Sequence, residues 1–337
     1  MKKIGFIAIV FALFMMFVAC GVDSEKKAPA NKKVSIVAAI YPQYDWLKNV
    51  LGERADSVDL KLLVKNGTDL HSYKPSAQDI ASIAGADIVV YVGGESDGWI
   101  EKALAATPKA GRVEVNMMRA LGDRVKQEEI VEGMQAEEEH EHGEEAEEHE
   151  HHEHGEEVEN DEHVWLSLKN AVRLVSAIAQ SLSKVDTANS SIYTANEVIY
   201  NGKLWALDKE FASAISGAKN KTILFGDRFP FRYLVDDYGI KYYAAFVGCS
   251  AESEASFETV AFLANKMDSL ALPAIFTIDG SDGKIARAIL EASKKSKQTP
   301  VLTLNSMQSV TDEQVKAGAD YLSMMRDNLE VLKKAIK

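Results

Sequence analysis

Two isolated histidines are the residues of this 337-residue chain that are best suited to metal binding or catalysis. His71 follows a strand-like segment and an Asn-Gly turn, and His163 stands directly before a sequence that opens a helix. Two carboxylates have similar positions, because Asp227 and Asp279 each follow a strand-like segment. Ligands of open α/β sheets gather beyond the carboxyl ends of the strands, where several loops converge. Two imidazoles and two carboxylates at that edge predict a site for a divalent ion such as zinc or manganese.

Each of these residues also has a simpler explanation when it is taken alone. A single loop histidine is more often a capping or solvated residue. Asp227 and Asp279 fit turn or N-cap positions. Cys249 could supply a soft metal ligand, but a lone cysteine is more often a small buried apolar residue. It is the convergence of four polar residues on one region that favours a metal site.

An acidic segment over 127–162 holds 18 acids, no Lys or Arg, and very few large apolar residues. We expect it to be disordered because it cannot build a core. Its histidines could hold zinc loosely, or they could be incidental members of a solvated charge run. They are His140, His142, His149, His151, His152 and His154. The rest of the chain has 38 basic residues against 33 acids and no dense basic stripe, so we expect no nucleic-acid partner.

The elements that would position the site residues alternate between short β-branched runs and longer helical stretches, which predicts an α/β fold with parallel sheets covered by helices. The strand-like runs fall into two sets, so we expect two similar lobes with the metal site in the cleft between them. The first set comprises 34–40, 60–64, 87–92 and 112–115, and the second comprises 222–225, 242–247, 274–278 and 301–304.

One long helix is predicted between the two sets, because apolar residues recur at near-helical spacing over 186–217. A helix of about 28 residues would measure about 42 Å, which makes it a stiff connection between the lobes. A last helix is predicted from Val315 to Ile336. The predicted domains are an α/β lobe at 34–185 that contains the insertion at 127–162, a linker helix at 186–217 and a second α/β lobe at 218–337.

The first 33 residues have the pattern of an export signal followed by a tether. Two lysines precede an apolar run that ends at Cys20, and a polar stretch follows to residue 33. The residues before Cys20 resemble a bacterial lipobox, so we expect a signal peptide at 1–19 and lipidation at Cys20. The tether would then be 20–33. Only Cys249 would remain, which excludes an intramolecular disulfide.

Two motifs resemble those of the zinc/manganese solute-binding lipoproteins of ABC transporters. Residues 66–76 read NGTDLHSYKPS, like the first histidine motif of that family, and residues 161–167 read DEHVWLS, like the second. An acidic, His-rich stretch before the second motif is typical of the zinc branch. Residues 248–256, GCSAESEAS, resemble a further family element in the second lobe.

This resemblance implies a lipid-anchored receptor on the extracytoplasmic face of the cell membrane that captures Zn²⁺, or alternatively Mn²⁺, for an ABC permease. It implies His71 and His163 as ligands. The usual third histidine is absent near Gly226, so its role is assigned to Asp227 and the fourth to Asp279. We expect a monomer that catalyses no reaction.

Two other functions remain open from the residues. A surface zinc hydrolase could use the same histidines with Glu252 or Glu254 as a general base, although no hydrolytic metal motif, phosphate loop or nucleophile elbow is present. An adhesin-type lipoprotein would leave His71 and His163 without a role.

Overall fold

The computed structural model describes residues 33–135, 159–250 and 254–336. The predicted signal peptide, residues 20–32 of the predicted tether with Cys20, and the six histidines of the acidic segment lie outside the described residues. The described residues from Val34 onward belong to one compact unit. Within it, no helix combines the length and the apolar character that crossing a membrane would require.

The first sheet contains four parallel strands, β1 (Ser35–Ala38), β2 (Asp59–Leu62), β3 (Ile88–Tyr91) and β4 (Val113–Asn116), in the order β2-β1-β3-β4. All four residues of β3 are buried, as expected for a central strand with helices on both faces. Each strand lies within a residue or two of its predicted position.

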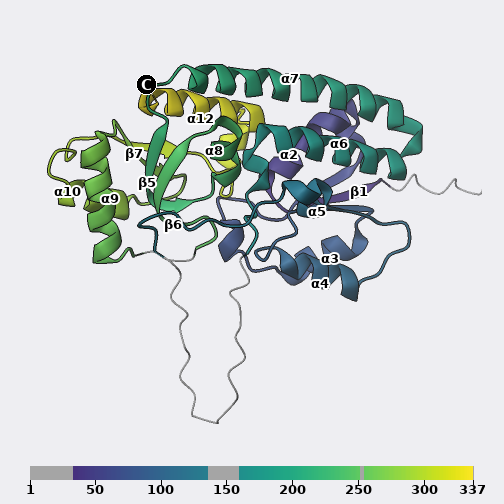
Figure 1. The fold of residues 1–337 in the computed structure, drawn as a ribbon. Helices are drawn as coiled ribbons and strands as arrows, with labels where there is room; N and C mark the ends of the chain where they lie inside the picture. Colours follow the sequence, from purple (N-terminus) through teal and green to yellow (C-terminus); the bar gives the residue numbers. More distant parts are fainter. Residues whose placement is uncertain (1–32, 136–158, 251–253, 337) are drawn as a thin grey trace, which may run out of the picture. The chain divides into compact units, whose positions relative to one another are not determined.

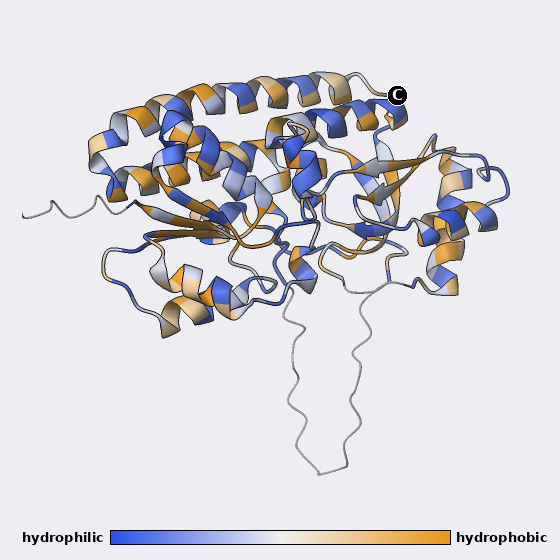
Figure 2. Ribbon diagram, turned by 180° about the vertical axis from the view of Figure 1, so that it is seen from behind, coloured by the Kyte–Doolittle hydropathy of each residue, from blue (hydrophilic) through white to orange (hydrophobic). Residues whose placement is uncertain are grey.

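The second sheet repeats this architecture with β5 (Thr222–Phe229), β6 (Lys241–Val247), β7 (Ile275–Ile278) and β8 (Val301–Leu304), in the order β6-β5-β7-β8. Two parallel four-stranded sheets with flanking helices confirm the predicted fold class (Figure 1). The strands of both sheets are mainly hydrophobic (Figure 2).

Helices connect the strands and cover both sheets (Figure 1). The α-helices are α2 (Tyr41–Leu51), α3 (Ala77–Gly85), α4 (Gly98–Ala106), α5 (Met117–Leu121), α6 (Leu168–Val185), α7 (Ser190–Ser216), α8 (Arg232–Tyr238), α9 (Phe257–Leu270), α10 (Lys284–Ala292), α11 (Asp312–Lys316) and α12 (Tyr321–Ala335). Short 3-10 turns are η1 (Gly52–Ser57), η2 (Leu70–Ser72), η3 (Gly122–Arg124), η4 (Val164–Leu166) and η5 (Thr187–Asn189).

Helix α7 is the long connection that the sequence predicts. It has 27 residues, or about 40 Å at 1.5 Å per residue, and it runs beside α2, α6, α8 and α12 (Figure 1). Its buried residues, among them Tyr200 and Phe211, join the same hydrophobic core as residues of both sheets. The two sheets are therefore held against a common rigid element.

Two predicted boundaries are wrong. The last helix is interrupted, because Gly318 has a φ of +92° and separates α11 from α12, which begins anew with a capping box at Asp320. Strand β5 continues past Phe225 to Phe229 through a shift in its register with β6. Asp227 therefore lies at an irregularity within the strand rather than in a loop after it.

Asp45 links three helices and leads to a prediction on stability. Its carboxylate on α2 accepts hydrogen bonds from the Tyr200 hydroxyl of α7 at 3.2 Å and from the Tyr321 amide of α12 at 3.3 Å. Burial, followed by the charge of Asp320, raises the pKa of Asp45 to about 6. The pKa of Asp45 is higher in the folded than in the unfolded protein. The free energy of unfolding therefore decreases as the pH rises from about 4 to about 6, because the buried carboxyl group ionises over that range.

We therefore expect Asp45→Asn to be more favourable for the free energy of unfolding at neutral pH than near pH 4. The difference between the two pH values should be up to about 3 kcal/mol. Urea unfolding at the two pH values measures this difference. Asp123→Asn, at an exposed position of η3, is the matched control for the loss of one negative charge. An equal effect of Asp45→Asn at both pH values would contradict the assignment.

Candidate metal site

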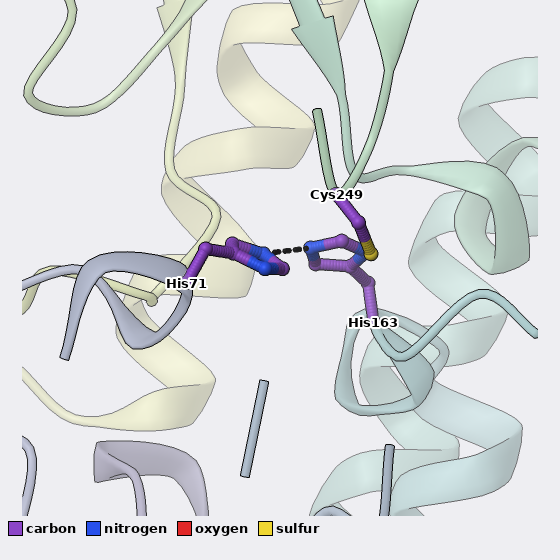
Figure 3. Close-up of side chains that lie close together, drawn as sticks. All are labelled: His71, His163 and Cys249. Atoms are coloured by element: carbon purple, nitrogen blue, oxygen red, sulfur yellow. Dashed lines mark hydrogen bonds between the residues drawn. The ribbon is translucent and has the colours of Figure 1, made fainter. Parts of the chain in front are cut away.

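The two predicted histidines, 92 residues apart in the sequence, meet in the structure. His71 lies in η2 after β2, and His163 immediately precedes η4. Their Nε2 atoms are 3.2 Å apart, and Figure 3 shows the two rings pointing toward each other. The convergence predicted for His71 and His163 is therefore present in the fold.

The same local turn presents both histidines. Asp69 stands two residues before His71 and accepts its backbone N–H at 2.9 Å, and Asp161 does the same for His163 at 2.8 Å. Such short Asp-to-backbone bonds form tight turns without help from regular secondary structure. The Asp-x-His pattern in each motif thus has a direct structural reason.

Neighbouring polar groups orient the two rings. Asp161 Oδ1 lies 3.0 Å from Nδ1 of His163, and the Ser96 hydroxyl lies 2.6 Å from Nδ1 of His71. A carboxylate at Nδ1 holds the proton there and leaves Nε2 with its lone pair, which is how metal-binding histidines are usually prepared. His163 is completely buried, so its Nε2 has no access to bulk water.

The electrostatics favour a neutral His71 ring. Burial, followed by the neighbouring His163, holds the pKa of His71 well below its ordinary value. Because a histidine must be neutral to coordinate a metal, a ring that is already neutral need not lose a proton on binding. Two facing Nε2 atoms also create a position that a cation would occupy favourably when both nitrogens present their lone pairs.

Cys249 and Gln308 complete the immediate surroundings. Cys249 follows β6, and its Sγ and one nitrogen of each imidazole all lie within 4.8 Å of one another. Among the residues that the structure describes, His71, His163 and Cys249 form the one group of three His, Cys, Asp or Glu side chains close enough to hold a metal ion together (Figure 3). Gln308 places its Nε2 at 2.6 Å from Nε2 of His71 and 2.9 Å from Nε2 of His163.

Sequence reasoning missed Gln308 and left Cys249 open between two roles. Gln308 comes four residues after β8 and is 3% exposed. Its position beyond the carboxyl end of a strand is where ligand-binding residues of α/β sheets are expected. An amide side chain has no distinctive metal-ligand spacing, however, so only the folded chain brings it to the histidines.

Asp227 and Asp279 line the same pocket as His71, which has a volume of about 420 Å³. They are not in the close group with the two imidazoles. Asp279 accepts hydrogen bonds from the Ser306 amide and hydroxyl and from the Ser309 hydroxyl, so both of its oxygens have partners. Asp227 accepts from two backbone amides, and burial raises its pKa. Their role as ligands stays a prediction.

The ends of the acidic segment belong to the folded body, so the predicted disorder does not extend to them. Gln127 pairs with Asn160 as an antiparallel bridge, and Gln135 pairs with Phe246 of β6. Glu128 accepts the backbone N–H of Cys249 at 3.2 Å. These short stretches gain backbone pairing from their neighbours, which composition alone does not reveal.

Asp161 allows a test of ring orientation. Asp161→Asn keeps the size of the side chain but can present an amide N–H to His163 Nδ1, which favours the wrong tautomer. We expect zinc affinity to fall about 10- to 100-fold, as for other supporting carboxylates of metal-bound histidines. Competition titration with a zinc chelator measures this loss, and exposed Asp123→Asn is the control. Equal affinities of the two variants would contradict the orienting role.

Comparison with known proteins gives consistent matches over most of the chain. Residues 36–335 match the family model described as zinc-uptake complex component A, periplasmic. The zinc-binding lipoprotein AdcA of Streptococcus pneumoniae serotype 4 is 34% identical over 337 residues, which cover 99% of this chain and 61% of AdcA. The high-affinity zinc uptake system protein ZnuA of Bacillus subtilis is 29% identical and is covered to 98%.

Solved structures agree with these matches. The Zn(II)-bound ZnuA-like domain of Streptococcus pneumoniae AdcA is 30% identical, with a TM-score of 0.66 over 90% of this chain and 99% of that domain. Zn(II)-bound AdcA itself gives a TM-score of 0.68, and the match covers 58% of it. This chain thus spans about three fifths of the length of AdcA.

Proposed function

The chain belongs to the family of periplasmic zinc-uptake complex component A, and from this premise we propose that it captures Zn²⁺ between His71 and His163 for import by an ABC permease. The observation that carries the proposal is the 3.2 Å distance between the two Nε2 atoms. Two imidazoles on one tetrahedral zinc would have their nitrogens about 3.3 Å apart, given Zn–N bonds of about 2.0–2.1 Å. The two rings therefore have nearly the spacing that zinc requires.

Zinc rather than manganese is the proposed cargo. Imidazole nitrogens suit zinc, whereas manganese prefers carboxylate, carbonyl and water oxygens. Asp227 and Asp279 are the carboxylates predicted to join the histidines, and substitution of each by asparagine tests that role. The names of AdcA and of ZnuA mention zinc, which supports the same choice.

The cell-surface setting is part of the proposal. We propose that Cys20 carries the lipid anchor, which holds a monomeric receptor on the extracytoplasmic face of the membrane, where it can meet the permease. The pattern of residues 1–20 and the word lipoprotein in the name of AdcA support this assignment. Radiolabelled palmitate incorporation into the wild-type chain but not into Cys20→Ala tests it.

A binding protein fits the site better than a hydrolase. A hydrolase needs a general base beside a metal-bound water, and the two candidates for that role were Glu252 and Glu254. Glu252 lies outside the described residues, and Glu254 is exposed. Around the two Nε2 atoms, the described contacts are His71, His163 and the Gln308 amide, none of which is a carboxylate base.

The experiment that tests the function is metal analysis of residues 21–337, followed by separate zinc and manganese titrations. We expect one tightly bound zinc per chain and much weaker manganese binding. Tight manganese with weak zinc would overturn the choice of cargo. Absence of any tight metal would overturn the receptor function.

The six clustered histidines lead to a separate prediction. We propose that they collect zinc with low affinity and raise its local concentration near the tight site, as tethered ligands do. Replacing all six with asparagine should leave the tight site unchanged and slow growth when zinc is scarce, by about twofold or more. Growth of the variant strain in chelator-treated medium measures this effect, and added zinc should restore it. Unaltered growth would show that the histidines are dispensable.

A further inference from the structure

We propose that the Cys249 thiolate is the third ligand of the captured metal, so that the site is a sulfur-containing His₂Cys centre. This inference rests on the proposed function, because it assigns a ligand to the same ion. The sequence predicted carboxylates for this role. This inference instead takes the third donor from the second residue after β6.

The distances permit this coordination with a small movement. A tetrahedral zinc with Zn–N bonds of about 2.05 Å and a Zn–S bond of about 2.3 Å separates sulfur from nitrogen by about 3.6 Å. Cys249 Sγ lies within 4.8 Å of one nitrogen of each histidine, which is about 1.2 Å more than the separation in such a site. A rotation of the cysteine side chain spans a distance of that order.

Packing holds the cysteine at this place. A Cβ atom on Gly248, the residue before it, would lie 2.9 Å from Cε1 of the His163 ring. The end of β6 therefore rests directly on that imidazole, and Gly248 permits the close approach. The Cys249 amide donates to Glu128 Oε1, and a further side-chain hydrogen bond joins the thiol to the Glu128 carboxylate.

Gln308 provides an independent indication that this cluster binds a ligand. Its Oε1 is buried and has no hydrogen-bond partner, although its Nε2 contacts both histidines. A buried amide oxygen without a partner is unfavourable, because it loses its hydrogen bonds to water without replacement. A cation held by the two imidazoles would give that oxygen an electrostatic partner, whereas another hydrogen-bond donor is not supplied by the described side chains.

The carboxylates predicted for the same role are less available. Asp279 has hydrogen-bond donors at both oxygens, and Asp227 is held by two backbone amides. Neither belongs to the close group with the imidazoles. Coordination by either one would require it to leave existing partners.

Sulfur coordination has a consequence for selectivity. Binding breaks the S–H bond, forms the metal–sulfur bond and releases one proton, which the Glu128 carboxylate or water accepts. Thiolates favour zinc and other thiophilic ions over manganese. Cys249 would therefore be the residue that excludes manganese from a site whose other ligands are compatible with several divalent ions.

Cobalt substitution tests the proposal directly, since Co²⁺ adopts tetrahedral zinc sites and absorbs in the near ultraviolet when a thiolate is bound to it. We expect this charge-transfer band in residues 21–337 loaded with Co²⁺. It should disappear in Cys249→Ser and Cys249→Ala and persist in Asp227→Asn and Asp279→Asn. Cys249→Ser should also weaken zinc at least tenfold and reduce the preference for zinc over manganese.

The outcomes separate this inference from the proposed function. Tight cobalt and zinc binding without the band, together with unchanged zinc affinity in Cys249→Ser, would overturn sulfur coordination and leave the receptor function standing. Loss of the band in Asp227→Asn but not in Cys249→Ser would also overturn it. Failure of the wild-type chain to bind either metal tightly would overturn the proposed function itself. Thermal unfolding of each metal-free variant verifies that it folds.

Discussion

Replacing His71 and His163 together with alanine is expected to abolish tight zinc binding, and each single replacement should weaken it by at least about 100-fold. Each change removes one of the two nitrogen donors that lie 3.2 Å apart, and no other described histidine can take its place. The remaining imidazole could still hold zinc, but without the second ring it loses the preorganised spacing. Competition titration against a chelator of known affinity measures the loss.

The structure indicates that these variants should still fold. The site lies at the ends of strands and in short turns, whereas the hydrophobic core is built from other residues. Metal-free His71→Ala is therefore expected to unfold at a temperature similar to that of the wild type. His163→Ala should unfold at a lower temperature, because it truncates a completely buried side chain, but it should still fold. Added zinc should raise the unfolding temperature of the wild type only. A single variant that binds zinc within about threefold of the wild type would contradict the assignment of that histidine.

Trp165→Ala is expected to cost about 3–5 kcal/mol of unfolding free energy and to weaken zinc binding as well. Trp165 is completely buried in η4, and its Nε1 donates to the Ser306 carbonyl at 2.8 Å. Its own carbonyl accepts the Tyr321 hydroxyl of α12 at 2.6 Å, and its ring packs 5.3 Å from that of His163. The residue thus ties one metal-site histidine to the loop after β8.

Urea unfolding measures the stability term, and chelator competition measures the affinity. Trp205→Ala is the matched control, because Trp205 lies on α7 with 44% of its surface exposed. That change should cost less than about 1 kcal/mol, since an exposed side chain leaves no cavity. Similar losses in the two tryptophan variants would show that Trp165 has no special structural role.

The architecture and the family follow largely from the sequence. Local patterns of β-branched runs and helical stretches place eight strands within a few residues of their positions, and apolar spacing locates α7. The resemblance of the two histidine motifs to zinc-binding lipoproteins is confirmed by the family match over residues 36–335. These features are readable because hydrophobic periodicity and short motifs are properties of neighbouring residues.

The errors have equally physical causes. The pattern of apolar residues from Val315 to Ile336 is continuous, yet the left-handed backbone of Gly318 interrupts the helix. The charge of the acidic segment predicts disorder throughout, yet Gln127 and Gln135 find backbone partners in distant parts of the fold. In both places the average composition of a segment predicts one structure, whereas a single residue or a single backbone pairing determines another.

The sequence by itself determined that His71 and His163 are presented by matching Asp-x-His turns, because each turn is formed by residues two positions apart. Only the tertiary structure decided what lies beside them. Cys249 and Gln308 come from the ends of two strands of the second sheet, 86 and 145 residues beyond His163, and parallel packing brings those ends to the imidazoles. The composition of a metal site is a matter of distances between remote segments, and those distances exist only once both sheets have packed against α7.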